Sequence, residues 1–382
     1  MKVLVIPTWY PSGADKLLGI YHKDFTKALA ENKNIDVDML YIDRQRLKNF
    51  FSYFKMQKKE IDIEDNYKVY KYLMLNVSPI SFKLQLYLYT KKMEKAFLDY
   101  ISKNGKPDII HSHVMIPAGY AATKIGKKYN IPVIVTEHSS YFKRYFKKDN
   151  KKYSDFVLEN ATISTVSNYM KNEVLNYTDN CEIIPNFVDT TLFNNNPKKK
   201  KSSKLRLVST CALRQGKRVD DILKALKIII KQYKIKDIHL DIVGDGYYMN
   251  YYKQVCNDLK LNSYVSFLGK KEKVEVAEIL KNEDIFIISS DLETFSITGI
   301  EALASGLPIV STKCMGPEEY INKDCGVLCE VGNPNDMARA IIECSKKKYD
   351  VDKLKKAAFK FDKKEVISKT IKLYNRIIKE NV

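Results

Sequence analysis

The stretch DLETFSITGIEALASGLPIVST, residues 291–312, decides the fold of this chain. It follows a short apolar run, Ile285 to Ile288, which predicts a strand buried on both faces of a parallel sheet. The spacing of apolar residues from Ile297 to Ser305 predicts a helix, and the run Pro308 to Ser311 predicts the next strand. A strand, a helix and a second strand in this order indicate an α/β domain.

Two carboxylates flank the start of the predicted helix. Glu293 lies where the first strand ends, and Glu301 follows eight residues later on the helix. Backbone N–H groups from Ser296 to Gly299 point out of a helix N-terminus, which suits a diphosphate. A carboxylate about one turn into such a helix can accept hydrogen bonds from a ribose diol, and one at the start of the loop can reach sugar hydroxyls. A single glutamate on a helix is usually a solvated charge, so the prediction depends on the joint pattern.

This block resembles the E-x7-E motif of the retaining family 4 glycosyltransferases, which have the GT-B fold. The family usually has Gly or Ser where this chain has Thr294. The resemblance implies that Glu293 acts in catalysis and that the following residues bind a nucleotide-sugar donor: Phe295, Ser296, Ile297, Thr298 and Glu301.

A second motif, STCALRQGKRVDD at residues 209–221, resembles the phosphate-binding loop of the same family. Lys217 matches the lysine that neutralises the diphosphate of the donor, so we expect it to act in catalysis. The family usually adds an arginine earlier in the loop, where this chain has Ala212. Either Arg214 or Arg218 could replace it. The alternative is that these charges belong to a solvated basic loop.

Further motifs extend the resemblance over most of residues 205–335. Val243 to Gly246 resembles the VGDG turn of the family, which implies that Gly244 lies at the donor site, although such a turn also serves as a plain connection. Val265 to Gly269 resembles the strand that ends near the base and ribose. Gly316-Pro317-Glu318-Glu319 and Gly326-Val327-Leu328 complete the resemblance.

The first half resembles the acceptor domain of this family. Pro7 to Pro11 and Gly19 match the opening of bacterial exopolysaccharide glycosyltransferases, which implies that Gly19 contacts substrate. His138 follows a predicted strand and matches a histidine that contacts the reacting sugar, so we expect it to be catalytic. His111 is more often a structural histidine at such a position, and Glu137 serves either the site or the end of its strand.

Predicted strands and helices alternate along all 382 residues, which indicates two doubly wound α/β domains. The polar run NNNPKKKKSSK at 194–204 predicts a linker. We therefore expect an acceptor domain at 1–193, a nucleotide-sugar domain at 205–362, and a terminal helix at 363–382 that packs back toward the first domain. The resemblance implies the GT-B arrangement, in which two Rossmann-like domains face each other across a cleft.

Net charge is +19, which favours an anionic partner: a phosphate-bearing substrate, an anionic lipid or a nucleic acid. Seven scattered cysteines indicate reduced thiols, and the chain has neither a predicted membrane span nor a signal peptide, so we expect a cytoplasmic protein. Aromatic and basic residues alternate in 44–55 and 141–148, which predicts peripheral contact with an anionic membrane at the inner face of the cell membrane. Nucleic-acid stacking or plain packing would use the same residue types.

These patterns predict a retaining glycosyltransferase. We expect it to transfer a sugar from a UDP-sugar to a saccharide or lipid-linked saccharide in the synthesis of cell-surface polysaccharide or glycoconjugate. The charge of the leaving group would be stabilised by Lys217 and helix amides, so we expect no metal and no cofactor, and we expect the five histidines to form no metal-binding group. The alternatives are a nucleotide-sugar epimerase or sugar phosphorylase of the same fold, and a basic nucleic-acid-binding protein.

Overall fold

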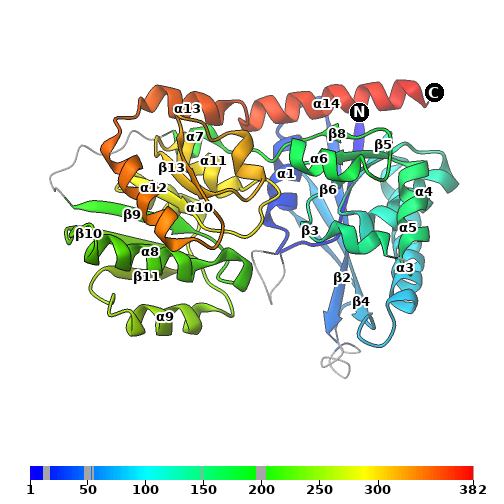
Figure 1. Ribbon diagram of the computed structural model, residues 1–382. Coiled ribbons are helices and arrows are strands. Elements are labelled where there is room, and N and C mark those ends of the chain that lie inside the picture. The colour runs from blue at the N-terminus through cyan, green and yellow to red at the C-terminus, as the bar shows by residue number, and fades with distance from the viewer. Residues whose placement is uncertain (12–17, 47–52, 54–55, 148, 195–203, 382) are drawn as a thin grey trace. The chain divides into compact units, whose positions relative to one another are not determined.

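The computed structural model describes residues 1–381 except 12–17, 47–52, 54–55, 148 and 195–203. The chain folds into two compact units. Unit 1 comprises residues 1–166, 170–184 and 367 onward, and unit 2 comprises residues 167–169 and 185–366. Each unit is an α/β domain built on one sheet (Figure 1), which confirms the predicted pair of parallel-sheet domains.

The sheet of unit 1 has the strand order β3-β4-β2-β1-β5-β6-β7-β8. Neighbouring strands run parallel except β3, which pairs antiparallel with β4 at the edge of the sheet. Apolar side chains cover both faces of the central strand β1, where Val3 to Ile6 are fully buried. The strands are β1 (Lys2–Pro7), β2 (Asp36–Arg46), β3 (Lys59–Ile63), β4 (Lys68–Asn76), β5 (Ile109–His113), β6 (Val133–Glu137), β7 (Thr162–Thr165) and β8 (Glu182–Ile183).

Helices connect these strands and cover the sheet (Figure 1). The longest, α3, begins at a serine cap in which the Ser81 hydroxyl accepts a hydrogen bond from the N–H of Leu84. The helices are α1 (Ile20–Ala30), α3 (Phe82–Asn104), a π-helical turn (Met115–Gly119) leading into α4 (Tyr120–Tyr129), a 3-10 turn (Phe142–Phe146), α5 (Lys151–Asn160) and α6 (Asn168–Val174). The terminal helix α14 (Lys363–Glu380) contributes its residues from Ile367 onward to this unit.

The sheet of unit 2 has six parallel strands in the order β11-β10-β9-β12-β13-β14. Counted along this unit, the order is 3-2-1-4-5-6, the arrangement of a Rossmann fold, in which ligands bind where the strand order reverses. Here the reversal lies between β9 and β12, which pair directly. The strands are β9 (Leu205–Thr210), β10 (Ile238–Val243), β11 (Val265–Gly269), β12 (Ile285–Ile288), β13 (Ile309–Thr312) and β14 (Gly326–Cys329).

Apolar residues of the unit 2 helices pack against this sheet. One face is covered by α8, α9 and α12, whose Leu226, Tyr252 and Ile341 are fully buried in one cluster with strand residues. Burying each such side chain contributes about 2 kcal/mol. The helices are α7 (Thr190–Phe193), a 3-10 turn (Gln215–Lys217), α8 (Val219–Lys231), α9 (Met249–Asp258), α10 (Lys273–Leu280), α11 (Ile297–Ala304), a 3-10 turn (Gly316–Glu319), α12 (Pro334–Lys346) and α13 (Val351–Phe359).

The division between the two units differs from the predicted one at its first boundary. The chain passes from unit 1 to unit 2 between Ile184 and Pro185, so residues 185–193, which we placed in the first domain, pack in unit 2. Their contact there is a short bridge between Val188 and Asp362. The predicted linker at 194–204 lies almost entirely outside the described residues.

The structure describes only one of the two segments predicted to contact a membrane in full enough detail to judge its rings. Most of the first, residues 44–55, lies outside the described residues. In the second, Phe142 and Tyr145 are buried and Phe146 stacks on Tyr177 with ring centroids 3.8 Å apart, so these rings pack inside unit 1. Among the described residues, no helix is both long and apolar enough to span a bilayer. All seven cysteines are free, and six of them are buried.

Candidate functional site

The strongest polar cluster of unit 2 lies at the reversal point of its sheet. The loop after β9 carries Lys217, and the loop after β12 carries Glu293. The Lys217 ammonium donates to the Glu293 carboxylate in an ion pair, and the Ser290 hydroxyl donates to the same carboxylate oxygen at 2.6 Å. The two charged side chains are 15% and 14% exposed, so the pair is largely shielded yet still open to a ligand.

Backbone contacts hold the two loops together. The N–H of Asp291 donates to the carbonyl of Gly216 at 2.9 Å, and the Ser289 hydroxyl donates to the carbonyl of Lys217 at 2.6 Å. These hydrogen bonds hold the loop that carries Lys217 against the loop that carries Glu293. Sequence motifs far apart in the chain are thus brought into direct contact.

A third loop supports Glu293 from the other side. The backbone N–H of Glu293 donates to the carbonyl of Cys314 at 2.9 Å, and the backbone carbonyl of Glu293 accepts from the N–H of Gly316 at 3.0 Å. A Cβ at position 316 would lie 2.5 Å from the nitrogen of Phe295, so only glycine fits there. This contact explains why Gly316 follows the motif block.

Helix α11 begins without a side-chain cap. Its N-cap residue Ser296 has φ 70°, a strained conformation for a non-glycine residue, which costs on the order of 1 to 3 kcal/mol and is typical of functional loops. Tyr320 holds this turn, because its hydroxyl donates to the carbonyl of Ser296 at 3.1 Å. The first N–H groups of the helix are left for an anion.

The predicted donor-binding residues of α11 divide into two groups. Ser296, Ile297 and Thr298 are partly exposed at the start of the helix, and Glu301 is 6% exposed within it. Phe295 is fully buried and packs edge-to-face on Phe361 with centroids 5.0 Å apart. Its side chain therefore anchors the loop, and only its backbone can face a ligand.

In the VGDG turn, Gly244 contacts the backbone of the phosphate loop at Cys211 and has no side chain to offer a ligand. Gly244 has φ 136°, and a Cβ there would lie 1.9 Å from the carbonyl oxygen of Cys211. The N–H of Leu213 donates to the carbonyl of Asp245 at 2.9 Å. Gly244 therefore fixes the path of the loop that carries the basic residues.

The structure distinguishes the two candidate arginines. Arg218 is committed to protein contacts: its Nε donates to Asp221 at 2.6 Å and its Nη1 to Asp291 at 3.3 Å. Arg214 is exposed, and its guanidinium makes no hydrogen bond or ion pair within the described part of the chain. Arg214 is therefore the arginine left available for a ligand.

In unit 1, His138 follows β6 directly after Glu137. The Glu137 carboxylate is fully buried and accepts hydrogen bonds from the N–H groups of Met115, His138 and Ser139 at 2.9, 2.9 and 2.7 Å. Burial raises the pKa of Glu137 to about 7 despite these donors. Glu137 thus closes the strand end and fixes the backbone of His138.

The other expected residues of unit 1 have structural contacts. Both ring nitrogens of His111 are bonded, one to the Tyr374 hydroxyl and one to the Thr136 hydroxyl at 2.7 Å. Gly19 has φ 75°, and a Cβ there would lie 2.4 Å from the carbonyl oxygen of Trp9. Gly19 therefore lets the backbone of Trp9 approach closely at the start of α1.

A histidine that our sequence analysis missed joins this region. His22 on α1 stacks on His113 with ring centroids 4.6 Å apart, and His113 Nδ1 lies 3.0 Å from His138 Nε2. His22 Nδ1 and His113 Nε2 are buried without a hydrogen-bond partner, which typically costs about 1 to 3 kcal/mol for each atom. We expected the histidines to form no metal-binding group, yet a helix residue distant in sequence packs onto the two strand ends and brings three of them together.

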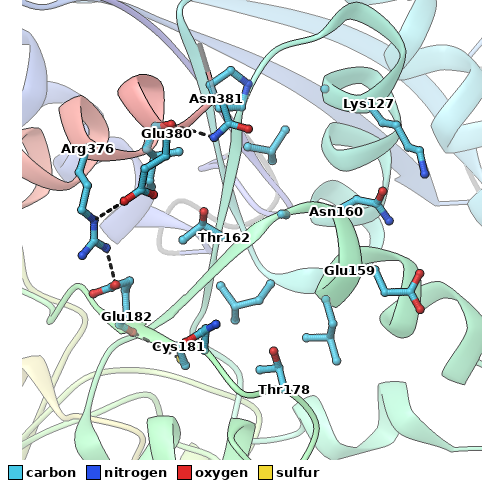
Figure 2. Close-up of a pocket in the computed structure, with 18 of the residues that line it drawn as sticks. Lys127, Glu159, Asn160, Thr162, Thr178, Cys181, Glu182, Arg376, Glu380 and Asn381 are labelled. Carbon is cyan, nitrogen blue, oxygen red and sulfur yellow. Dashed lines mark hydrogen bonds and ion pairs between the residues drawn. The ribbon is translucent and has the colours of Figure 1, made fainter.

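A large cavity of unit 1 lies at the opposite edge of the sheet. The cavity, shown in Figure 2, has a volume of about 1010 Å³. Its lining includes Val133 and Thr162, the first residues of β6 and β7. Arg376 of α14 pairs there with Glu182 and, at 3.8 Å, with Glu380. These pairs fasten the end of α14, and none of the motif residues lines the cavity.

Comparison with known proteins gives two family matches. Residues 23–192 match the family described as Glycosyltransferase Family 4, and residues 191–361 match the family described as Glycosyl transferases group 1. The chain belongs to the family 4-like glycosyltransferases of the GT-B fold. The two matches overlap at residues 191–192, and they contain His138, Lys217, Glu293 and Glu301, whereas Gly19 and His22 precede them.

Relatives and solved structures agree with this membership. This family 4-like chain is 29% identical over 256 residues to N-acetyl-alpha-D-glucosaminyl L-malate synthase of Bacillus anthracis, which is 63% of the chain and 65% of the relative. It is 29% identical over 248 residues to an uncharacterised glycosyltransferase of Methanocaldococcus jannaschii, 62% and 65% of the two chains. These curated relatives are thus matched over just under two thirds of their length.

A solved structure shares the fold over nearly the whole chain. HepE of Anabaena, in complex with UDP, superposes with a TM-score of 0.72 at 15% identity and covers 98% of this chain and 100% of its own. At that identity the likeness establishes the fold alone. The chemistry of this family 4-like chain must therefore be argued from its own site.

Proposed function

We propose that this protein is a retaining glycosyltransferase that transfers a sugar from a UDP-sugar to a saccharide or lipid-linked saccharide. The observation that carries the proposal is the Lys217–Glu293 pair beside the uncapped start of α11, with Glu301 buried in the same helix. The product would be a cell-surface polysaccharide or glycoconjugate, assembled on the cytoplasmic side of the membrane.

The diphosphate would lie against the N-terminus of α11. Lys217 would leave Glu293 for the leaving diphosphate and stabilise the charge that develops as the glycosidic bond breaks. The free guanidinium of Arg214 would supply the second phosphate contact. Helix amides and two side-chain cations would then supply the positive charge at the diphosphate, so we propose transfer that needs no metal ion there.

The two carboxylates would bind different parts of the donor. Glu301 would accept hydrogen bonds from the ribose diol, and Glu293, released from Lys217, would hold hydroxyls of the transferred sugar. Solved structures of HepE with UDP and with UDP-glucose support a uridine donor. His138 is proposed to contact the reacting sugar, because its backbone is fixed by Glu137 and its ring stays neutral: burial lowers its pKa well below 6.5.

Retention would follow from a same-face reaction. In this scheme the bond to the leaving phosphate breaks while the acceptor hydroxyl attacks the same face of the sugar. A leaving phosphate oxygen then accepts the proton of that hydroxyl. The scheme is economical because the leaving group supplies the base, and the protein's work is positioning and charge stabilisation.

A surface of unit 1 supports contact with an anionic membrane. The outer face of α3 exposes Leu84, Tyr87 and Leu88, with Tyr87 59% exposed. A groove of about 260 Å³ between α3 and α4 is lined by four lysines around this face: Lys83, Lys91, Lys124 and Lys128. Apolar side chains bordered by lysines are typical of peripheral helices at anionic lipid. We propose this face in place of the segment at 141–148, where Phe142 and Tyr145 are buried and Phe146 stacks on Tyr177.

Vesicle cosedimentation tests this surface. We expect binding to anionic vesicles at low salt that weakens at high salt and is lost when Leu84, Tyr87 and Leu88 are changed to Ser. Lys143→Glu, in the segment at 141–148, is the control and should bind like the wild type. Equal binding by the triple variant would refute the assignment.

A donor assay tests the proposed reaction. UDP-sugars are incubated with and without a saccharide or lipid-linked acceptor, and released UDP and glycoside product are measured. We expect product only with acceptor, in the anomeric configuration of the donor. Free sugar or an epimerised donor without acceptor would favour an epimerase, and dependence on inorganic phosphate would favour a phosphorylase. A nucleic-acid-binding protein would instead bind DNA or RNA with an affinity that falls steeply with salt.

A further inference from the structure

Three histidines from separate elements converge at the carboxyl edge of the unit 1 sheet. His22 lies on α1, His113 ends β5 and His138 follows β6. One ring nitrogen from each lies within 4.8 Å of the corresponding nitrogens of the other two. The rings pack at centroid distances of 4.6, 5.0 and 5.1 Å.

The contacts of these rings leave coordinating capacity unused. Among the described residues, Nδ1 of His22 and Nε2 of His113 are buried and have no hydrogen-bond partner. The exposed fraction is 4% for His22 and 1% for His113. The neighbouring His111 shows the contrast, because hydroxyl groups bond to both of its ring nitrogens. Aromatic side chains enclose the group: Trp9 stacks on His22, Phe25 contacts His113 and Tyr21 contacts His138.

We propose that His22, His113 and His138 bind one Zn²⁺ ion. Three neutral imidazoles form a common zinc-binding set, and an imidazole must be neutral to coordinate. Zn–N bonds of about 2.0 to 2.1 Å require ligand nitrogens about 3.3 Å apart, so small ring rotations would close the set. His138 is partly exposed and gives the ion an entry path.

The site has a consequence for transfer, which rests on the proposed function. An ion held by His138 withdraws that ring from the reacting sugar. Zn²⁺ is therefore an inhibitor of this enzyme rather than its cofactor. The chemistry at the diphosphate remains with Lys217 and α11.

The first experiment measures binding alone on the full chain. Competition with a chromogenic chelator gives the stoichiometry and affinity for Zn²⁺, and the absorption spectrum of the Co²⁺ form reports the ligand type. We expect one ion per chain, with visible bands of nitrogen ligation and without the intense near-ultraviolet bands of thiolate. His22→Phe keeps an aromatic ring in the stack and should lose at least tenfold in affinity.

A matched control separates this site from histidine binding in general. His239 of unit 2 contacts Ser266 at 2.9 Å and Asp241 at 3.2 Å, so His239→Asn should bind Zn²⁺ like the wild type. Circular dichroism verifies the fold of each variant, and His22→Gln serves if His22→Phe does not fold. Unchanged affinity in the folded His22 variant, or thiolate bands in the Co²⁺ spectrum, overturns the proposal.

A second arm tests inhibition as the fraction of each variant's own activity that Zn²⁺ removes. We expect Zn²⁺ to inhibit the wild type and His239→Asn, and to inhibit the His22 variant at least tenfold less potently. Binding without inhibition overturns the consequence for transfer and leaves the metal site standing. Absence of transferase activity in every condition overturns the proposed function and leaves the binding arm decisive for the site.

Discussion

Replacing Glu293 with Gln should tighten the binding of UDP while it impairs transfer. In the free protein the Lys217 ammonium is occupied by Glu293, so an incoming diphosphate must displace that carboxylate. Exposed ion pairs contribute about 0 to 1 kcal/mol, and in a buried pair the cost of desolvation offsets much of the attraction. With side chains 15% and 14% exposed, we assign about 1 kcal/mol to the contact that is displaced, which corresponds to about a fivefold lower Kd.

Turnover should change in the opposite direction. The Glu293→Gln variant would lose a charge-assisted hydrogen bond to the sugar that is worth about 1.5 to 3 kcal/mol. This loss should lower kcat by about 10- to 150-fold. Isothermal titration calorimetry with UDP and steady-state kinetics measure the two effects. Glu301→Gln is the comparison, because loss of its contact to the ribose should weaken UDP binding. Weaker UDP binding by Glu293→Gln would refute the proposed displacement.

The remaining predictions concern the same loops. Lys217→Ala should lower kcat more than it raises KM, because the ammonium stabilises charge that develops in the transition state; kinetics with unchanged kcat would contradict this role. Chelator should leave wild-type transfer intact, and activity that is lost in EDTA and restored by Mg²⁺ would contradict transfer without a metal. Gly316→Ala should lower the free energy of unfolding by about 1 to 3 kcal/mol, since its Cβ would lie 2.5 Å from a backbone nitrogen. Gly216→Ala is the control, because its Cβ would meet only a side-chain oxygen at 3.9 Å, and its free energy of unfolding should be close to that of the wild type. Thermal melts of the two variants and the wild type measure these changes.

Much of the fold was predictable because buried parallel strands are short apolar runs. The runs at 285–288 and 265–269 are strands at the predicted bounds. The hairpin of β3 and β4 was missed. Charged and apolar residues are mixed in β3, KEIDI, which lies at the edge of the sheet, and β4, KVYKYLMLN, has two lysines among its first four residues. A turn signal at Glu64 to Asn66, where the N–H of Glu64 donates to the carbonyl of Tyr67, marks it in retrospect.

The candidate site was predictable where it depends on local motifs. Lys217 and Glu293 were both expected, but their ion pair depends on strand order, which brings β9 beside β12. The choice between Arg214 and Arg218 depended on carboxylates at 221 and 291 that the motif does not specify. His22 carried no signal, because a histidine on an amphipathic helix gives no sign of the strand ends against which it packs.

Saturation-transfer difference NMR with a panel of nucleotide sugars tests the central claim most directly. The panel contains UDP-glucose, UDP-galactose, UDP-N-acetylglucosamine, GDP-mannose and ADP-glucose, each with the wild type and with Glu301→Gln. The account predicts saturation of the ribose and uracil protons of a UDP-sugar by the wild type, and a strongly reduced signal with Glu301→Gln. No signal from any donor, or equal signals from the two proteins, would contradict the assignment of this site.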